Sequence, residues 1–541
     1  MVRVVAVLTA LATIAIGQTQ RWVYRCNGTG NGDDAASSLV VGPDGNIYAV
    51  GYTTGSGTGA DFTVISLTPA DSERWVYRYN GPGNGDDYAA ALVFGPDSNL
   101  YAAGYSTGSG TGTDFTVVSL TPGGTERWVY RYNGPGNDDD DASSLVVGPD
   151  RNIYATGYST GNGTSYDFTV ISLTPADSER WVYRYDSPAS GTDWGEAIVF
   201  GADGNIYAGG NREGSGGYQN IAVISLTPGG SERWVYGYDG PGAGGDRGSS
   251  LMYGGDGNIY VAGNTTGNGT SYDFTVISLT PADSERWVYR YNGPGNEMDQ
   301  ARTKSLAWGA DGNIYAAGFS GGDGTFWDMV VISLTPGDSE RWVYRYDGPG
   351  HSYDMGGPAV CGADGNVYTA GYSTGLGTGY DFTVIGLTPG DSERWVYRYD
   401  GPMLDYDVAD DLVFGPDGNI YAAGVSTGIG TGADFTVVSL NPSSGVAEAG
   451  PALTRDAPGL LSARVQGRVL AYRLKLAEPA RVSMSLYDLQ GRRVVGWQVH
   501  APAGASHYTQ GLSALSSGVY FLTAGVSGQS QSERRKVLVW R

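Results

Sequence analysis

The sequence has 541 residues, with 88 glycines, 39 tyrosines and 13 tryptophans but only 7 methionines. Short apolar runs between glycine-rich segments are typical of an all-β protein, and this aromatic content excludes a disordered chain. The formal net charge of −23 argues against a nucleic-acid-binding protein, because phosphates require a basic face.

The charge is unevenly distributed along the chain. Residues 451–541 hold 12 Lys or Arg and 4 Asp or Glu, net +8, whereas residues 1–450 hold 21 and 52, net −31. The break coincides with NPSSGVAEAGPALTRDAP, whose Pro, Gly and Ser content predicts a linker. We therefore expect an acidic domain over 18–441, a linker over 442–458 and a second domain over 459–541.

The first residues have the pattern of an export signal. Arg3 precedes an apolar run from Val4 to Ile16, and the small residue Gly17 follows it. This order predicts a signal peptide over 1–17 that is cleaved after Gly17. The alternative is an uncleaved anchor, for which the run is short. We expect a secreted or outer-surface protein that passes through the periplasm and has no transmembrane segment after cleavage.

A tandem repeat fills the acidic region. Its marker is a tryptophan that recurs every 53 residues, with one interval of 55 whose two additional residues fall in DQARTKSLAWGADGN. The markers are Trp22, Trp75, Trp128, Trp181, Trp234, Trp287, Trp342 and Trp395. Each unit holds four strand-like runs, such as ALVFG, NLYAAGYS, DFTVVSLT and RWVYRYN, separated by turn residues. Four-stranded sheets that are apolar on both faces predict a β-propeller, in which the sheets stack around an axis.

The repeat is out of phase with the ends of the region. Residues 21–27 match the fourth run with no first three before it, and residues 411–440 match the first three with no fourth after them. Joined in one sheet, the two remnants leave no open edge. We predict an eight-bladed β-propeller whose closing blade is shared by the N- and C-terminal strands, followed by a small Ig-like β-sandwich. A seven-bladed ring with a spare repeat is the alternative.

The consensus unit GPDGNIYAAGYSTGSGTG, followed by DFTVISLTP and RWVYRY, resembles the bacterial β-propeller repeat known as SBBP. The resemblance covers about residues 21–440. The family is named for seven blades, and this chain departs from it with eight repeats. What the resemblance implies is an extracellular bacterial surface protein, without any particular chemistry.

The last 80 or so residues contain LYDLQGRRV, LSSGVYFL and the basic terminal run RRKVLVWR. They resemble the C-terminal sorting domain of the type IX secretion system. The resemblance implies that this domain carries the protein across the outer membrane and that the secretion machinery is a partner. The matching positions are Tyr487, Asp488, Gly491, Arg492, Gly518, Tyr520 and Lys536. An ordinary Ig-like accessory domain is the alternative.

An aspartate follows every marker tryptophan at a spacing of twelve residues. The set is Asp34, Asp87, Asp140, Asp193, Asp246, Asp299, Asp354 and Asp407. In a closed propeller these residues form a ring, which we call the acidic ring, between the fourth strand of one unit and the first of the next. The favoured interpretation is structural, with each carboxylate bonding the N–H groups of its own loop. The alternative is a site for Ca²⁺ or another cation.

Departures from the repeat cluster in the loops of one face, whereas the turns of the opposite face scarcely vary. A recognition surface requires distinct residues, and drift in unconstrained loops is the alternative explanation. The candidate ligand-binding residues on this face are Trp194, Arg212, Tyr218, Trp327, His351, Tyr353 and Tyr406.

Nothing in the repeats forms a recognisable catalytic or metal-binding motif. His351 is the one histidine outside the tail and cannot build a zinc site alone. We therefore predict no catalytic residues, no metal ligands and no cofactor, with Ca²⁺ as the alternative. The expected function is that of a non-catalytic scaffold, not an enzyme, which binds a polysaccharide or a protein. The alternatives are an extracellular propeller hydrolase or lyase that uses carboxylates of this face, and a structural or adhesive surface component.

Overall fold

The computed structural model describes residues 20–322, 324–403, 405–442, 461–466, 469–476, 479–487, 492–501, 504–512, 518–526 and 532–539. The predicted signal peptide, and the predicted linker after residue 442, lie outside these ranges. The chain divides into two compact units, Met1–Glu448 and Ala449–Arg541. No helix in the described ranges is long and apolar enough to cross a bilayer.

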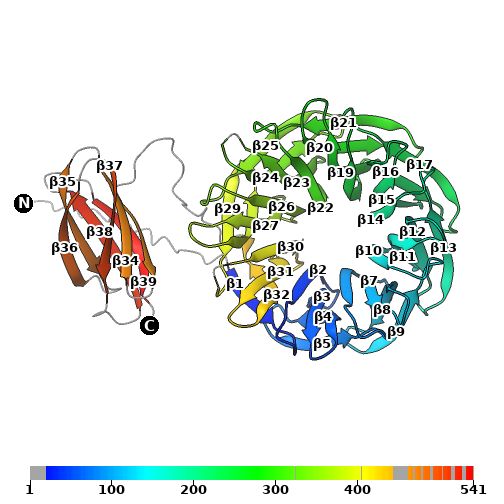
Figure 1. The fold of residues 1–541 in the computed structure, drawn as a ribbon, viewed down its shortest axis with the longest axis horizontal. Coiled ribbons are helices and arrows are strands. Elements are labelled where there is room, and N and C mark those ends of the chain that lie inside the picture. Colours follow the sequence, from blue (N-terminus) through cyan, green and yellow to red (C-terminus); the bar gives the residue numbers. More distant parts are fainter. Residues whose placement is uncertain are drawn as a thin grey trace, which may run out of the picture. The chain divides into compact units, whose positions relative to one another are not determined.

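The first unit is an eight-bladed β-propeller, which confirms the predicted fold (Figure 1). Each blade is one antiparallel sheet of four strands, A to D, counted outward from the axis. The A strands are β2 (Ala35–Val41), β6 (Tyr88–Phe94), β10 (Asp140–Val147), β14 (Trp194–Phe200), β18 (Arg247–Tyr253), β22 (Asp299–Trp308), β26 (Asp354–Cys361) and β30 (Asp407–Phe414). They define blades 1 to 8 in that order.

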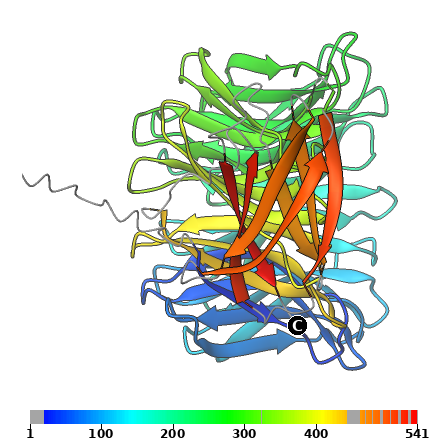
Figure 2. The same cartoon turned by 90° about the vertical axis from the view of Figure 1, so that its left-hand side faces the viewer.

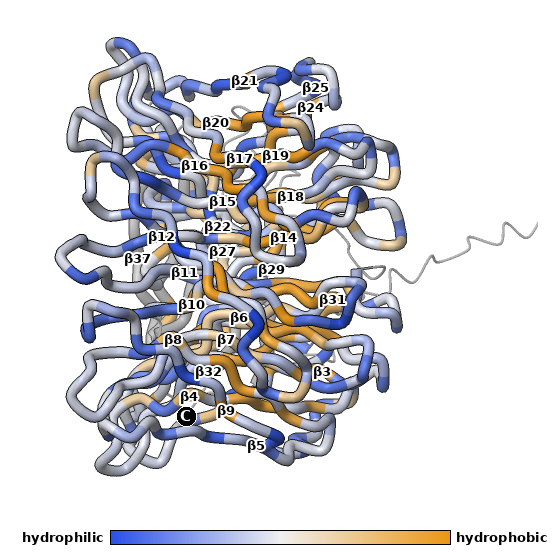
Figure 3. The backbone as a smooth tube through the Cα atoms, turned by 90° about the vertical axis from the view of Figure 1, so that its right-hand side faces the viewer, coloured by the Kyte–Doolittle hydropathy of each residue, from blue (hydrophilic) through white to orange (hydrophobic). Residues whose placement is uncertain are grey.

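The B and C strands form the middle of every blade. The B strands are β3 (Ile47–Gly55), β7 (Leu100–Thr107), β11 (Ile153–Thr160), β15 (Ile206–Glu213), β19 (Ile259–Thr266), β23 (Ile314–Gly321), β27 (Val367–Thr374) and β31 (Ile420–Gly428). The C strands are β4 (Gly59–Leu67), β8 (Thr113–Leu120), β12 (Tyr166–Leu173), β16 (Gln219–Leu226), β20 (Tyr272–Leu279), β24 (Trp327–Leu334), β28 (Tyr380–Leu387) and β32 (Gly432–Leu440). Both sets are buried along almost their whole length because neighbouring blades cover both of their faces. Figure 3 shows these hydrophobic strands inside the ring, with hydrophilic loops at its two faces.

The D strands form the rim. They are β5 (Glu73–Tyr79), β9 (Glu126–Tyr132), β13 (Glu179–Tyr185), β17 (Glu232–Tyr238), β21 (Glu285–Tyr291), β25 (Glu340–Tyr346), β29 (Glu393–Tyr399) and β1 (Gln20–Cys26). Their marker tryptophans link adjacent blades: the indole Nε1–H of Trp75, for example, donates to the carbonyl oxygen of Pro122 in the next blade at 3.0 Å. The closing blade makes the same hydrogen bond: the indole Nε1–H of Trp22 donates to the carbonyl oxygen of Pro69 at 3.0 Å.

The ring closes as the phase of the repeat predicts. Strand β1 pairs antiparallel with β32, with Val23 opposite Val438 and Tyr24 opposite Val437. The N-terminal strand is therefore the D strand of blade 8, whose A, B and C strands come from the end of the first unit. No repeat is left over, so the seven-bladed alternative is wrong.

The described residues of the second unit form seven strands in two sheets, drawn as the orange and red arrows of Figures 1 and 2. One sheet has the order β33–β34–β37, and the other has the order β36–β35–β38–β39. The strands are β33 (Leu461–Gln466), β34 (Val469–Leu476), β35 (Ala480–Tyr487), β36 (Arg493–Ala501), β37 (Gly504–Gly511), β38 (Gly518–Val526) and β39 (Ser532–Val539). Strand β35 alternates buried and half-buried residues, with Val482, Met484 and Leu486 fully buried.

The predicted sorting residues fall on this unit. Tyr487 ends β35, Gly518 begins β38, and Tyr520 of β38 pairs with Val537 of β39. Lys536 lies on β39 opposite Phe521. Arg492 immediately precedes β36. Asp488 and Gly491 lie outside the described residues. The resemblance to a sorting domain stays a prediction.

Candidate functional site: the central channel

Every A strand carries a β-bulge where it lines the channel. In blade 3 the register shifts between Ala142 and Ser144, so Ser143 has no partner on β11. The other blades shift at the equivalent place. A bulge re-aims the side chain of the additional residue, and here it turns that residue out of the sheet and toward the axis. In blades 1 to 5 and 8 the bulge residues are Ser37, Ala90, Ser143, Glu196, Ser249 and Asp410.

Blade 6 holds the two additional residues of the 55-residue interval, and they enlarge its bulge. The register shift in β22 spans Ala301 to Leu306, and Lys304 within it has a positive φ of 58°. The enlarged bulge extends far enough that β22 contacts β14 of blade 4. The Lys304 ammonium donates to the carbonyl oxygen of Ser37 at 3.1 Å and to Asp411 at 2.7 Å, and so joins blade 6 to blades 1 and 8.

A cavity of about 590 Å³ lies on the axis among these bulges. Its walls come from the A strands of seven blades and include every bulge residue named above together with Thr303 and Lys304. Three carboxylates line it: Asp141 from blade 3, Glu196 from blade 4 and Asp410 from blade 8. The other bulge positions on its wall in blades 1, 2, 3 and 5 hold serine or alanine.

Burial raises the pKa of all three carboxyl groups. The pKa of Asp141 rises to about 7, first because the group is desolvated and second because Glu196 is close to it. Its Oδ1 atom is buried and has no hydrogen-bond partner among the described residues. Desolvation also raises the pKa of Asp410 to about 6, against the opposing charges of Arg302 and Lys304. A carboxyl group with a pKa near 7 holds its proton under conditions in which an ordinary aspartate has lost it.

Glu196 is held in place by its neighbours. The indole Nε1–H of Trp194 donates to Glu196 Oε1 at 2.7 Å. The guanidinium carbon of Arg247 lies 5.8 Å from the centre of the Trp194 ring. Desolvation raises the pKa of Glu196, whereas the Trp194 hydrogen bond and the Arg247 charge lower it. Both neighbours favour the ionised form of Glu196 and oppose the net upward shift, whereas no basic side chain acts on Asp141, so the two carboxyl groups have different surroundings.

The acidic ring is built into the loops of the propeller. All eight carboxyl groups are fully buried. Each accepts two backbone N–H groups, one from the residue six positions earlier and one from the end of its own B strand; Asp140, for instance, binds Gly134 N at 2.6 Å and Thr160 N at 2.9 Å. The other seven repeat this pair. Each aspartate therefore braces the loop between adjacent blades.

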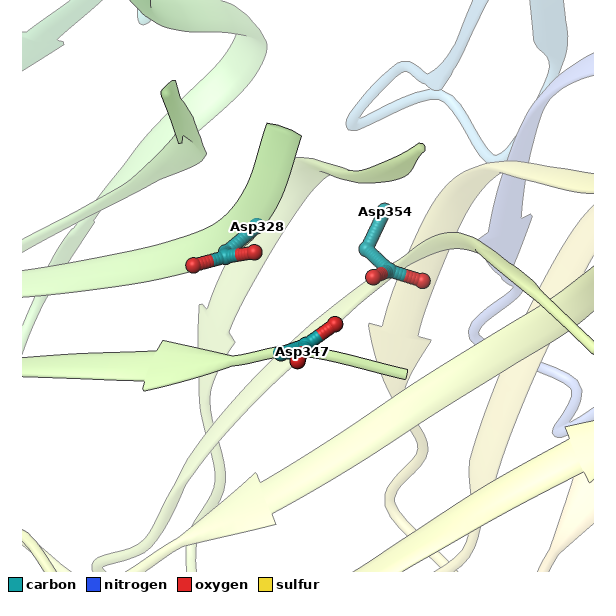
Figure 4. A group of neighbouring side chains, drawn as sticks. All are labelled: Asp328, Asp347 and Asp354. Atoms are coloured by element: carbon teal, nitrogen blue, oxygen red, sulfur yellow. The ribbon is translucent and has the colours of Figure 1, made fainter. Parts of the chain in front are cut away.

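One member of the acidic ring belongs to a denser cluster, drawn in Figure 4. Carboxylate oxygens of Asp328, Asp347 and Asp354 lie within 4.8 Å of one another. Two cationic or hydrogen-bonding side chains face this cluster: Arg345 contacts Asp328 at 2.6 Å, and His351 Nδ1 lies 2.6 Å from Asp347. These contacts offset part of the negative charge. The calcium alternative stays a prediction.

The candidate residues of the variable face do not form one site. Trp194 lies on the channel wall beside Glu196. Arg212 of blade 4 donates a hydrogen bond to the Tyr185 hydroxyl of blade 3 at 3.3 Å. Tyr218 is 53% exposed in the loop before β16.

The other four candidates lie around blades 6 to 8. Trp327 packs against Tyr353 with ring centres 5.0 Å apart, and His351 is in the same loop as Tyr353. Tyr406 packs on Tyr380 at 5.8 Å. Figure 1 shows blade 4 on the opposite side of the ring from blade 8, so Arg212 and Tyr406 are not parts of one contact surface.

The channel carboxylates Asp141, Glu196 and Asp410 are absent from the candidates that the sequence suggested. For Glu196 and Asp410 the signal was present at a fixed repeat position, three residues after each acidic-ring aspartate, whereas Asp141 lies one residue after Asp140 and outside this position. At the fixed position the eight units have Ser37, Ala90, Ser143, Glu196, Ser249, Arg302, Gly357 and Asp410. A position that changes in charge and size while its neighbours repeat has a role that differs between blades. The bulge that turns it to the axis leaves no mark in the hydrophobic pattern.

No family model and no curated protein matches the sequence. Solved structures with a similar fold include an α-L-arabinanase from Penicillium chrysogenum bound to arabinobiose (12% identity, 56% of this chain and 93% of that chain, TM-score 0.37). Another is a family GH93 α-L-arabinofuranosidase of Fusarium graminearum with arabinobiose (12%, 56% and 93%, TM-score 0.35). A third is a family GH43 arabinoxylan arabinofuranohydrolase from Bacillus subtilis (12%, 83% and 95%, TM-score 0.25).

The prediction of a non-catalytic scaffold that is not an enzyme is corrected here. The three similar structures are glycoside hydrolases, and the channel of this chain holds three desolvated carboxyl groups on one cavity. A passive scaffold does not require such groups, because desolvating a carboxyl group such as that of Asp141, whose Oδ1 has no hydrogen-bond partner among the described residues, costs free energy. At these sequence identities and TM-scores, the similarity does not transfer an activity to this chain. The function therefore has to be argued from the residues of the channel.

Proposed function

We propose that this protein is an extracellular glycoside hydrolase whose active site is the central channel of the propeller. The observation that carries the proposal is the convergence of Asp141, Glu196 and Asp410 on one cavity, from three different blades of an otherwise repetitive ring. Hydrolysis of a glycosidic bond uses two carboxyl groups, one protonated and one ionised, on either side of the bond. A cavity of about 590 Å³ has room for a sugar ring and its neighbours.

Asp141 is the proton donor in this proposal. Its pKa of about 7 keeps it protonated in weakly acidic and neutral solution, so it has a proton to give to the leaving-group oxygen. Its unpartnered Oδ1 lies in the desolvated wall and is not engaged by another described residue. Proton donation at this place lowers the barrier because the departing sugar oxygen leaves as an alcohol and not as an alkoxide.

Glu196 is the ionised partner. It accepts the Trp194 N–H and lies near Arg247, and both contacts stabilise its negative charge. An ionised carboxylate beside the anomeric carbon stabilises the positive charge that develops there in the transition state. Asp410 lines the same cavity from blade 8, where Arg302 and Lys304 offset its charge.

A hydrolysis assay on purified protein tests the proposal. We expect release of reducing sugar from at least one member of a panel of arabinan, arabinoxylan, galactan, pectin and alginate. Asp141→Asn and Glu196→Gln should each lower kcat by about 10²-fold or more, since general acid–base catalysis contributes about 10²–10⁴-fold. Asp138→Asn is the matched control: it makes the same charge change in blade 3 at an exposed residue. Loss of activity in the control, or its retention in both carboxylate variants, would refute the assignment.

We also propose that the second unit exports the enzyme through the type IX secretion system. The support is its resemblance to the sorting domain at Tyr487, Gly518 and Lys536, and the SBBP-like repeats agree with an extracellular destination. Deletion of residues 449–541 should then retain the propeller inside a type IX-competent host, as fractionation would show. Secretion of the truncated protein would contradict this role.

A further inference from the structure

Two arginines flank Glu196 in a recess beside the main cavity. The recess has a volume of about 250 Å³ and shares Glu196, Ser249 and Thr303 with the main cavity. Arg247 from β18 and Arg302 from the enlarged bulge of β22 line it. It is therefore continuous with the proposed catalytic carboxylates and lies on the Glu196 side of them.

Neither guanidinium group forms a direct ion pair, although Arg247 and Arg302 act at longer range on Glu196 and Asp410. In the described part of the chain no carboxylate oxygen lies within 4 Å of Arg247 or Arg302, whereas arginines of the rim such as Arg290 and Arg345 pair with an aspartate. Arg247 is exposed and rests over the Trp194 ring. The hydrogen bond recorded for Arg302 is a weak one, to Met355 Sδ at 3.8 Å.

The position of Arg302 is fixed by the insertion that is unique to blade 6. Lys304, two residues later in the same bulge, is tied to Ser37 and Asp411. This attachment holds the bulge across the channel and keeps Arg302 in the recess. In the other blades the equivalent bulge residue is Ser, Ala, Gly, Glu or Asp, so the recess has no basic counterpart elsewhere in the ring.

We infer that the recess binds an anionic substituent of the substrate, and that the substrate is therefore an acidic polysaccharide. The inference rests on the proposed hydrolase function and names its substrate class. Two guanidinium groups match the planar, bidentate geometry of a carboxylate and also accept a sulfate ester. The two guanidinium groups also offset the repulsion between Glu196 and a negatively charged sugar. A neutral substrate is not repelled by Glu196 and does not need them.

Binding calorimetry with the full chain tests the inference without requiring turnover. The acidic probes are tetrasaccharides from polygalacturonate, alginate and hyaluronan, and a sulfated galactan tetrasaccharide. Each is compared with its carboxyl-reduced or desulfated counterpart, so that the uronate and sulfate probes separate the two sources of charge. We expect at least one acidic probe to bind tenfold or more tightly than its neutral counterpart, since hydrogen bonds between charged groups are stronger than those between neutral ones.

Variants assign the effect to the recess. Arg247→Gln and Arg302→Gln should each remove most of the preference for the acidic probe, with little effect on the neutral one. Arg151→Gln is the matched control, because Arg151 is exposed in the turn between β10 and β11. Raised salt should weaken binding of the acidic probe alone.

The outcomes distinguish this inference from the proposed function. Arg-dependent binding of an acidic probe supports the recess even if no polysaccharide is cleaved. Hydrolysis of a neutral polysaccharide, with no preference for any acidic probe, overturns the inference and leaves the hydrolase standing. Equal binding of acidic and neutral probes, or a preference unchanged in both arginine variants, also overturns it.

Discussion

The ammonium of Lys304 in blade 6 lies 2.7 Å from a carboxylate oxygen of Asp411 in blade 8. The same Asp411 oxygen accepts the Ser38 hydroxyl at 2.9 Å. One ion pair thus links the enlarged bulge of blade 6 to the seam between blades 8 and 1.

Replacement of Lys304 by methionine should destabilise the propeller. The Asp411 side chain is 9% exposed, so removal of its counter-charge leaves a buried anion, whereas Lys304 at 37% is partly in water. We expect a loss of about 1–2 kcal/mol, below the 3–5 kcal/mol typical of fully buried pairs. Thermal unfolding of Lys304→Met, Asp411→Asn and the double variant measures it. Equal losses that simply add in the double variant would show that the two residues are not coupled.

Much of the fold could be predicted from the sequence because the same four-strand pattern occurs in eight units. The spacing of the tryptophans and the split unit at the two ends are sufficient to predict eight blades and their closure by β1. Even the insertion around Lys304 is visible as an interval of 55 residues. The length of the interval does not show where the two additional residues project. Whether two additional residues extend a surface loop or bend into the channel depends on register, which only the paired strands define.

The candidate site was harder to predict for a related reason. The loops of one face vary whereas the turns of the opposite face are uniform. This contrast predicts a site among exposed aromatic residues such as Tyr218 and Tyr406. The carboxylates of Asp141, Glu196 and Asp410 are single substitutions within strands. A regular strand places alternate residues on opposite faces, and the bulge breaks this alternation at Glu196 and Asp410; Asp141 lies two residues before the bulge of its own strand.

The pH dependence of hydrolysis should show a descending limb near pH 7. Asp141 acts as the proton donor and has a pKa of about 7, so its acid form is lost as the pH rises through that value. Activity should therefore be higher in weakly acidic solution than above pH 7. The measurement is kcat/KM against pH for the polysaccharide that proves to be cleaved. Glu196→Asp, if active, should keep the alkaline limb in place; an alkaline limb far above pH 7 would exclude Asp141 as the donor.

The acidic ring should make the propeller more stable at pH 5 than at pH 8. Desolvation raises the pKa of Asp34 and Asp87 to about 6 and of Asp140 and Asp354 to about 7, above the ordinary value of 3.8. The folded state thus binds these protons more tightly than the unfolded chain, and the stabilisation is full below about pH 4 and is lost as the pH rises through 6 to 7.

Thermal unfolding at a series of pH values tests whether the stability of the propeller decreases as the pH rises. General repulsion in the acidic domain changes in the same direction but is screened by salt, whereas the buried carboxyl groups are screened much less. The decrease in Tm from pH 5 to pH 8 should therefore persist in high salt. Asp140→Asn removes one titrating group and should reduce the slope. A Tm that rises over this interval would show that the ring carboxyl groups ionise as readily in the folded state as in the unfolded chain.

Closure of the ring makes blade 8 more sensitive than the others to loss of its rim tryptophan. Trp22 and Trp75 make the same hydrogen bond to the next blade, at 3.0 Å to Pro69 and Pro122. Strand β5, which carries Trp75, continues the chain from β4, but β1 is attached to β32 by pairing alone. Trp22→Ala should therefore lower Tm more than Trp75→Ala, a difference to which the deeper burial of Trp22 also contributes, because Trp22 is 8% exposed and Trp75 is half-buried.

Hydrogen exchange locates the effect. In Trp22→Ala the amides of β1 and β32 should lose protection before the rest of the ring, because detachment of β1 uncovers the edge of β32. The exposed edge should also promote self-association, which size-exclusion chromatography detects. Equal losses in the two variants, with β32 still protected, would mean that the pairing of Val23 with Val438 does not limit the stability of the ring.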